Sequence, residues 1–200
     1  PPHDDGAPRA SEPGTEQFST THLSVIDAEG NAVSLTSSVE SAFGSRLMVR
    51  GFMLNNQLTD FSFRPAVDGV PVANRVAPGK RPRSSMAPTL VFGQDGELLL
   101  AVGSPGGSRI IGYVTQVLIA MLDWGLDVQQ ALDLPHHVNR NGPLDVEAGT
   151  ALTGLETALS ERGHEVRLRK LISGLHAVAV TPGGLEGGAD PRREGIALGD

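Results

Sequence analysis

The stretch that decides the fold begins at Thr20 and reads Thr-Thr-His-Leu-Ser-Val-Ile-Asp over residues 20–27, Ala-Glu-Gly-Asn over 28–31 and Ala-Val-Ser-Leu-Thr-Ser-Ser-Val over 32–39. Two β-rich runs around a turn sequence predict a hairpin with Thr20 at its leading edge. Two further hairpins are expected, at residues 89–92 with 97–102 and at 176–180 with 185–186. Strands in such pairs predict mostly antiparallel sheet.

Helical segments follow these strands. Residues 110–126 form the most apolar run and predict a buried helix, with Ser108 as its cap and Gly125 at its end. A short helix capped by Asp127 should follow, and residues 150–162 predict another helix. Residues 165–171 should return as a strand, and Trp124 and Met121 are expected in the core. Sheets with packed helices predict an α+β protein.

Composition excludes several classes of function. The 200 residues carry a net charge of −7, which argues against a nucleic-acid partner. There is no cysteine, so disulfides, thiolate metal sites and cysteine nucleophiles are excluded. Residues 110–126 contain Thr115, Gln116 and Asp123, so no membrane span is expected. Residues 1–19 are rich in proline, glycine and charge and read as a solvated linker without an export signal.

Three clusters contain residues that could do chemistry: Ser-Thr-Thr-His at 19–22, Leu-Asn-Asn-Gln-Leu-Thr-Asp-Phe at 54–61, and Ser-Ser-Met-Ala-Pro at 84–88 with Gly-Ser-Pro-Gly-Gly-Ser-Arg at 103–109. Each cluster alone is weak evidence for a functional site, because a threonine in a strand is usually structural and a Gly-Gly pair before a helix is usually a turn. The basic residues 80–83 fit a solvated loop.

Read together and in this order, the clusters closely resemble the small subunit of γ-glutamyltransferase (γ-glutamyltranspeptidase), a member of the N-terminal nucleophile hydrolases. The resemblance runs from about Thr20 to Asp190 and includes the closing Ala-Asp-Pro-Arg at 189–192. It implies a four-layer αββα fold in which this chain supplies the half that bears the nucleophile. Residues 1–19 would be a linker or the tail of the large subunit, and 20–200 the catalytic small-subunit domain.

The resemblance also implies the chemistry. The family cuts its own chain before a threonine, here between Ser19 and Thr20, which frees an α-amine that can act as base for the Thr20 hydroxyl. Thr20 would then attack a γ-glutamyl amide such as glutathione and form a glutamyl ester, for transfer to water or to an amine. Neighbouring strand residues point to opposite faces, so only one of Thr20 and Thr21 can serve, and the family pattern places Thr20 at the cut.

Other roles carry over from the family motifs. Ser38 should orient the Thr20 hydroxyl, and the N–H groups of Gly106 and Gly107 should stabilise the tetrahedral oxygen. Substrate-binding roles fall on Ser84 and Ser85 for the α-carboxylate, and on Gln57, Asp60 and Glu40 for the α-ammonium. Glu40 stands where several relatives have asparagine.

Two alternatives remain open. The first is a glutaryl or cephalosporin acylase on the same scaffold, which would need no ammonium pocket. The second is a non-catalytic, unprocessed partner subunit, which the mass of the purified chain would distinguish.

The expected partners are a large subunit from the same precursor, which carries the arginine that grips the α-carboxylate, and a small γ-glutamyl substrate. No cofactor and no metal are expected: His136 and His137 lack a third ligand at a recognisable spacing and fit a solvent-facing loop, and His22 fits the first strand. The resemblance implies a periplasmic or extracellular location, and a cytoplasmic location is the remaining alternative.

Overall fold

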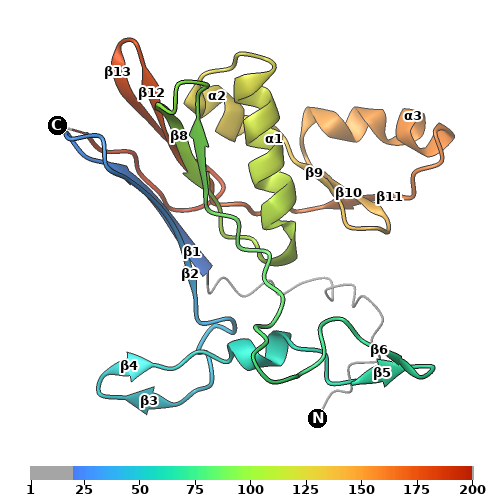
Figure 1. The fold of residues 1–200 in the computed structure, drawn as a ribbon. Helices are drawn as coiled ribbons and strands as arrows, with labels where there is room; N and C mark the ends of the chain where they lie inside the picture. Colours follow the sequence, from blue (N-terminus) through green and yellow to red (C-terminus); the bar gives the residue numbers. More distant parts are fainter. Residues whose placement is uncertain (1–19, 200) are drawn as a thin grey trace. The chain divides into compact units, whose positions relative to one another are not determined.

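The computed structural model describes residues 20–199 and shows mixed helix and sheet, as the α+β prediction requires (Figure 1). The described residues form two compact units, one with residues 20 and 38–84 and the other with 21–37 and 85–199. The expected linker at 1–19 lies outside the described residues. Among residues 20–199, no helix has the length and apolar character that a membrane crossing requires.

The first unit is built from short elements. Strands β3 (Met48–Val49) and β4 (Phe52–Met53) pair with each other, as do β5 (Ala66–Val67) and β6 (Val70–Pro71). Both connections have positive φ at two successive residues, at Arg50 with Gly51 and at Asp68 with Gly69. That pattern is typical of two-residue hairpins. The 3₁₀ helix η1 (Gln57–Asp60) lies between the two hairpins in the chain.

The leading hairpin is confirmed, with β1 (Thr20–Ile26) paired to β2 (Ala32–Ser38). Its turn is closed by Asp27, whose Oδ1 accepts from the backbone N–H of Glu29 at 3.1 Å and of Asn31 at 2.8 Å. Gly30 takes a φ of 85°, which glycine adopts without strain.

The other two hairpins join into one antiparallel sheet of order β13-β12-β8-β7. Its strands are β7 (Thr89–Phe92), β8 (Leu98–Gly103), β12 (His176–Thr181) and β13 (Gly184–Ala189). The sequence placed these strands correctly, although β13 is longer than the predicted 185–186.

Two helices cover one face of this sheet: α1 (Ile110–Leu122) and α2 (Val128–Asp133) (Figure 1). Asp127 caps α2 as predicted, in a reciprocal capping box with Gln130. The predicted Ser108 cap of α1 is wrong, because Ser108 lies inside the preceding 3₁₀ helix η2 (Gly107–Arg109). Trp124 was also wrongly assigned to the core, since α1 has already ended and its side chain is 60% exposed.

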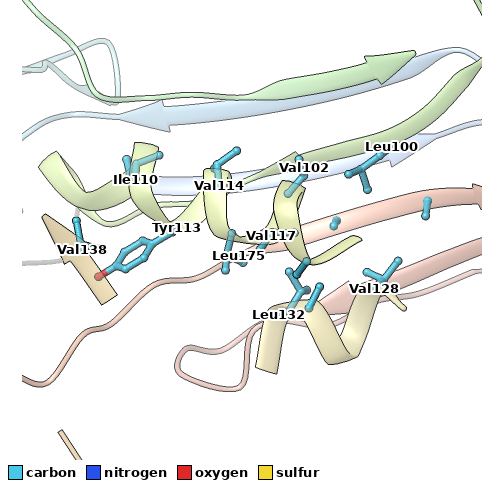
Figure 2. Close-up of a cluster of buried hydrophobic side chains, with 14 of the residues drawn as sticks. Leu100, Val102, Ile110, Tyr113, Val114, Val117, Val128, Leu132, Val138 and Leu175 are labelled. Atoms are coloured by element: carbon cyan, nitrogen blue, oxygen red, sulfur yellow. The ribbon is translucent and has the colours of Figure 1, made fainter. Parts of the chain in front are cut away.

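The core lies between these helices and the sheet (Figure 2). Leu100 and Val102 of β8 point toward α1, where Tyr113 and Val117 are fully buried. Leu132 of α2 belongs to the same cluster. Met121 packs against its edge, as expected.

The leading hairpin lies over the opposite face of the sheet. The Ser34 hydroxyl donates to the Val102 carbonyl at 2.9 Å, and a Cβ added at Gly103 would meet the His22 ring. The leading hairpin, the four-stranded sheet and helices α1 and α2 thus correspond to three layers of the predicted αββα arrangement.

A third sheet, of order β11-β10-β9, contains strands that were only partly predicted. Strand β11 (Val166–Arg169) was expected, but it runs parallel to β10 (Leu144–Glu147), an exception to the antiparallel pattern. Strand β9 (His137–Asn139) follows the histidine pair. The predicted helix at 150–162 begins as 3₁₀ helix η3 (Ala151–Leu155) and continues as α3 (Glu156–Glu161).

Candidate active site

The hydroxyls of Thr20 and Ser38 meet at the open end of the leading hairpin. Thr20 is the first residue of β1 and Ser38 the last of β2, and antiparallel pairing brings such positions together. The half-buried Thr20 Oγ1 donates to Ser38 Oγ at 3.0 Å, and Ser38 Oγ also accepts the Glu40 N–H at 2.9 Å. Thr21 is exposed, on the other side of the strand. Thr20 therefore has the hydroxyl that a neighbouring group orients.

Glu40 is held beside this pair by Asn56. Its φ of 73° is left-handed, and its Oε2 accepts from the Ser41 hydroxyl at 2.7 Å and from the Asn56 side-chain amide. Asn56 also donates its backbone N–H to the Val39 carbonyl at 3.2 Å. The segment at 54–61 is thereby joined to the end of β2. Asn56 was not singled out from the sequence, although it is the second asparagine of the Asn-Asn-Gln motif.

Gln57 and Asp60 lie together on η1. Gln57 Nε2 donates to Asp60 Oδ2 at 2.9 Å. Burial raises the pKa of the Asp60 carboxyl, and the Glu40 charge adds to this, whereas the Gln57 hydrogen bond and Arg83 oppose it. Gln57 Oε1 is buried and has no hydrogen-bond partner among residues 20–199. A buried acceptor of this kind, beside a carboxylate, is suited to a cationic donor.

Ser84 and Ser85 occupy the segment before β7. Ser84 is exposed and belongs to the first unit, whereas Ser85 is half-buried and belongs to the second. Arg83, just before them, donates its backbone N–H to Asn74 Oδ1 at 3.0 Å.

The two glycines form a turn between β8 and α1. Gly106 is buried with a φ of 138°, and Gly107 is exposed with a φ of 58°. Arg109 donates its backbone N–H to the Gly106 carbonyl at 3.2 Å. Within residues 20–199 no acceptor is found for the N–H of Gly106 or of Gly107. Two unpaired donors on a tight turn can stabilise an oxygen that gains negative charge.

Two histidines are buried and neutral. His22 lies on β1 as expected, with Nδ1 2.8 Å from Thr36 Oγ1, and burial lowers its pKa to about 4. His136 corrects the expectation of a solvent-facing pair, because its ring is fully buried and contacts Ser173 Oγ at 2.7 Å. Burial lowers its pKa to about 4 as well. Its neighbour His137 is exposed, on β9, because strand alternation turns neighbours to opposite sides.

Sequence reasoning did not identify the buried network around His136. Asp190 accepts from the Ser173 hydroxyl, and Arg192 binds both Asp190 Oδ1, at 3.1 Å, and Glu147 Oε1, at 2.7 Å. The signal available was the closing Ala-Asp-Pro-Arg at 189–192, which contains Asp190 and Arg192 of this network. Among residues 20–199, no group of three or more His, Asp or Glu side chains could hold a metal ion.

The fold is that of the N-terminal nucleophile hydrolases. Residues 3–200 match the family model described as Gamma-glutamyltranspeptidase, and the chain belongs to that family.

The chain is similar to two curated proteins and to one solved structure. The chain is 41% identical over 187 residues to a glutathione hydrolase proenzyme of Escherichia coli (strain K12), covering 88% of this chain and 32% of the relative. It is 33% identical over 189 residues to the Acylase ACY 1 proenzyme of Pseudomonas sp. (strain SE83), covering 92% of this chain and 33% of that one. A solved gamma-glutamyltranspeptidase from Pseudomonas nitroreducens superposes with a TM-score of 0.78 at 34% identity, covering 90% of this chain and 99% of that chain. The chain thus spans about a third of the length of these curated relatives.

Proposed function

We propose that the protein transfers or hydrolyses the γ-glutamyl group of amides such as glutathione, through an ester on Thr20 that forms after self-cleavage between Ser19 and Thr20. The observation that carries the proposal is the 3.0 Å contact between the Thr20 and Ser38 hydroxyls. A threonine hydroxyl is a poor nucleophile at its ordinary pKa, so it needs both an orienting group and a base. Ser38 supplies the first.

The α-amine of Thr20, freed by cleavage, supplies the base, because such an amine has an unperturbed pKa of about 8. The Thr20 oxygen attacks the γ-carbonyl and its proton passes to the amine. The N–H groups of Gly106 and Gly107 stabilise the oxyanion, and collapse of the tetrahedral species expels the leaving amine with that proton. Water or a second amine then attacks the ester and releases Thr20.

The substrate α-ammonium is assigned to Asp60, Gln57 and Glu40. Asp60 is a partly desolvated carboxylate, which is why its pKa is raised, and a bound ammonium would offset that cost. Gln57 Oε1 offers a buried acceptor that is otherwise unpaired within the described chain. Glu40 adds a second carboxylate charge near the same place, and its Oε2 is held by Ser41 and Asn56. Ser84 and Ser85 are assigned to the substrate α-carboxylate.

The partner is proposed to be the large subunit of the same precursor. The outward face of the β1–β2 hairpin carries Leu23, Val25, Val33 and Leu35, which are 44–51% exposed. A contiguous apolar face of this kind requires cover. The Escherichia coli relative is named a proenzyme and is about three times as long as the matched region. The family resemblance favours a periplasmic or extracellular location.

A glutaryl or cephalosporin acylase is the second candidate, favoured by the similarity to the Acylase ACY 1 proenzyme. It would use Thr20 and the glycines, but a glutaryl substrate has no α-ammonium for Asp60 and Gln57 to bind.

The deciding experiment compares turnover of a chromogenic γ-glutamyl anilide with that of the matching glutaryl anilide by the complete, processed protein. The two substrates differ only in the α-amino group. Faster turnover of the γ-glutamyl substrate supports the proposal, and faster turnover of the glutaryl substrate favours the acylase. No turnover of either would refute both.

A further inference from the structure

The glycine turn has no large side chain of its own to hold it. It consists of Pro105, Gly106, Gly107 and Ser108, and both glycines have positive φ. Glycine leaves the backbone free to adopt many conformations, so the direction of these N–H groups must be fixed from outside. The next residue, Arg109, has the first long side chain.

Arg109 connects the turn to the middle of the β11-β10-β9 sheet. Its guanidinium donates twice to one oxygen of Asp145, from Nε at 3.1 Å and from Nη2 at 3.0 Å. The Arg109 side chain is 3% exposed and that of Asp145 7%. Asp145 is paired with Val138 on one side and Arg167 on the other, so its backbone is held by both neighbouring strands. The turn is therefore anchored to the most constrained strand of that sheet.

A second link supports the same attachment. Arg140, which follows β9, donates to the Ser108 hydroxyl and also lies 3.8 Å from Asp145 Oδ2. The other oxygen of Asp145 faces Arg169, whose Nε lies 3.2 Å away. Thus Oδ2 faces the turn, whereas Oδ1 faces β11.

We propose that Arg109 and Asp145 are positioning residues, which aim the N–H groups of Gly106 and Gly107 at the oxygen that becomes negative. The inference rests on the proposed function, and it assigns the pair no direct part in the reaction. Oxyanion donors act only when held at the position the oxygen will occupy. A displacement of about 1 Å can cost about 100-fold in rate.

The test uses the complete protein, with rates expressed per chain that begins at Thr20 so that unprocessed molecules are not counted. Asp145→Asn keeps the shape but removes the charge, and Arg109→Lys keeps the charge but removes the fork. Each should lower kcat on the γ-glutamyl anilide by about 10- to 100-fold with KM within about threefold, because the donors act in the transition state. Arg169→Gln is the matched control, since it removes a cation from the other oxygen of Asp145, and it should leave kcat within about threefold.

Hydrogen exchange supplies a readout that does not depend on activity. Exchange of the amides at residues 106–108 should be faster in Asp145→Asn and Arg109→Lys than in wild type and Arg169→Gln. Unchanged exchange in both variants, or a wild-type kcat per processed chain, would overturn the inference while leaving the proposed function intact. If wild-type protein turns over neither anilide, the proposed function fails, and the exchange rates alone decide whether the pair holds the turn.

Discussion

Alanine at Gly106 should damage the protein much more than alanine at Gly107. A Cβ at Gly106 would lie 2.7 Å from Tyr113 Cε2, in a backbone with a φ of 138° that other residues rarely adopt. Tyr113 cannot give way easily, because it is fully buried and its ring lies 4.4 Å from that of His136. Backbone strain of about 1–3 kcal/mol and overpacking of about 1–3 kcal/mol together predict a loss of roughly 2–6 kcal/mol.

Gly107 is the matched control. Its φ is 58°, and a Cβ there meets nothing within 4 Å, so alanine should cost only about 1–2 kcal/mol. Both variants keep the backbone N–H. Urea unfolding of the complete protein should give the highest free energy of unfolding for wild type, a lower one for Gly107→Ala and the lowest for Gly106→Ala. The processed fraction is measured on the same sample. Equal losses in the two variants would refute the packing argument.

Asp60→Asn should reduce kcat/KM for the γ-glutamyl anilide by at least about 10-fold more than for the glutaryl anilide, since only the first has an ammonium to pair; equal losses would make Asp60 structural. Glu40→Gln should leave self-cleavage intact but change the KM for the γ-glutamyl donor, and a processing failure would contradict its assignment to the substrate. Burial lowers the pKa of His136 from 6.5 to about 4, so the unfolded chain binds this proton more readily than the folded protein does. The neutral ring therefore contributes fully to the free energy of unfolding above about pH 6.5. That contribution, up to about 3 kcal/mol, is lost as the pH falls toward 4. The loss of unfolding free energy between pH 7.5 and 5 should therefore be smaller in His136→Gln than in wild type, and an equal loss in the two proteins would contradict the burial argument.

Hairpins and helix caps could be predicted from the sequence, because the alternation of side chains and the turn residues determine them locally. The three hairpins and the Asp127 cap follow from strand patterns, turn residues and capping preferences close together in the chain. The contact between Thr20 and Ser38 was expected from the family resemblance. The roles of Gly106 and Gly107 came from family resemblance. They remain predictions, although the unpaired N–H groups are consistent with them.

What could not be predicted depends on contacts between distant segments. His136 is buried because Ser173 and Gln116, 37 and 20 residues away, provide hydrogen-bond partners for its ring. The parallel pairing of β10 with β11 requires the intervening η3 and α3 to cross back, and no local pattern indicates this. Trp124 continued the apolar run in sequence but lies beyond the end of α1, which stops at Leu122.

The central claim is that cleavage before Thr20 creates the nucleophile. Terminal sequencing of the smaller chain in the mature protein tests it most directly, with Thr20→Ala, Thr20→Ser and Thr21→Ala as companion variants. We predict a chain that begins at Thr20 in wild type and Thr21→Ala, partial cleavage and partial turnover in Thr20→Ser, and neither in Thr20→Ala. A mature chain that begins at Thr21, or an active Thr20→Ala protein, would contradict the account.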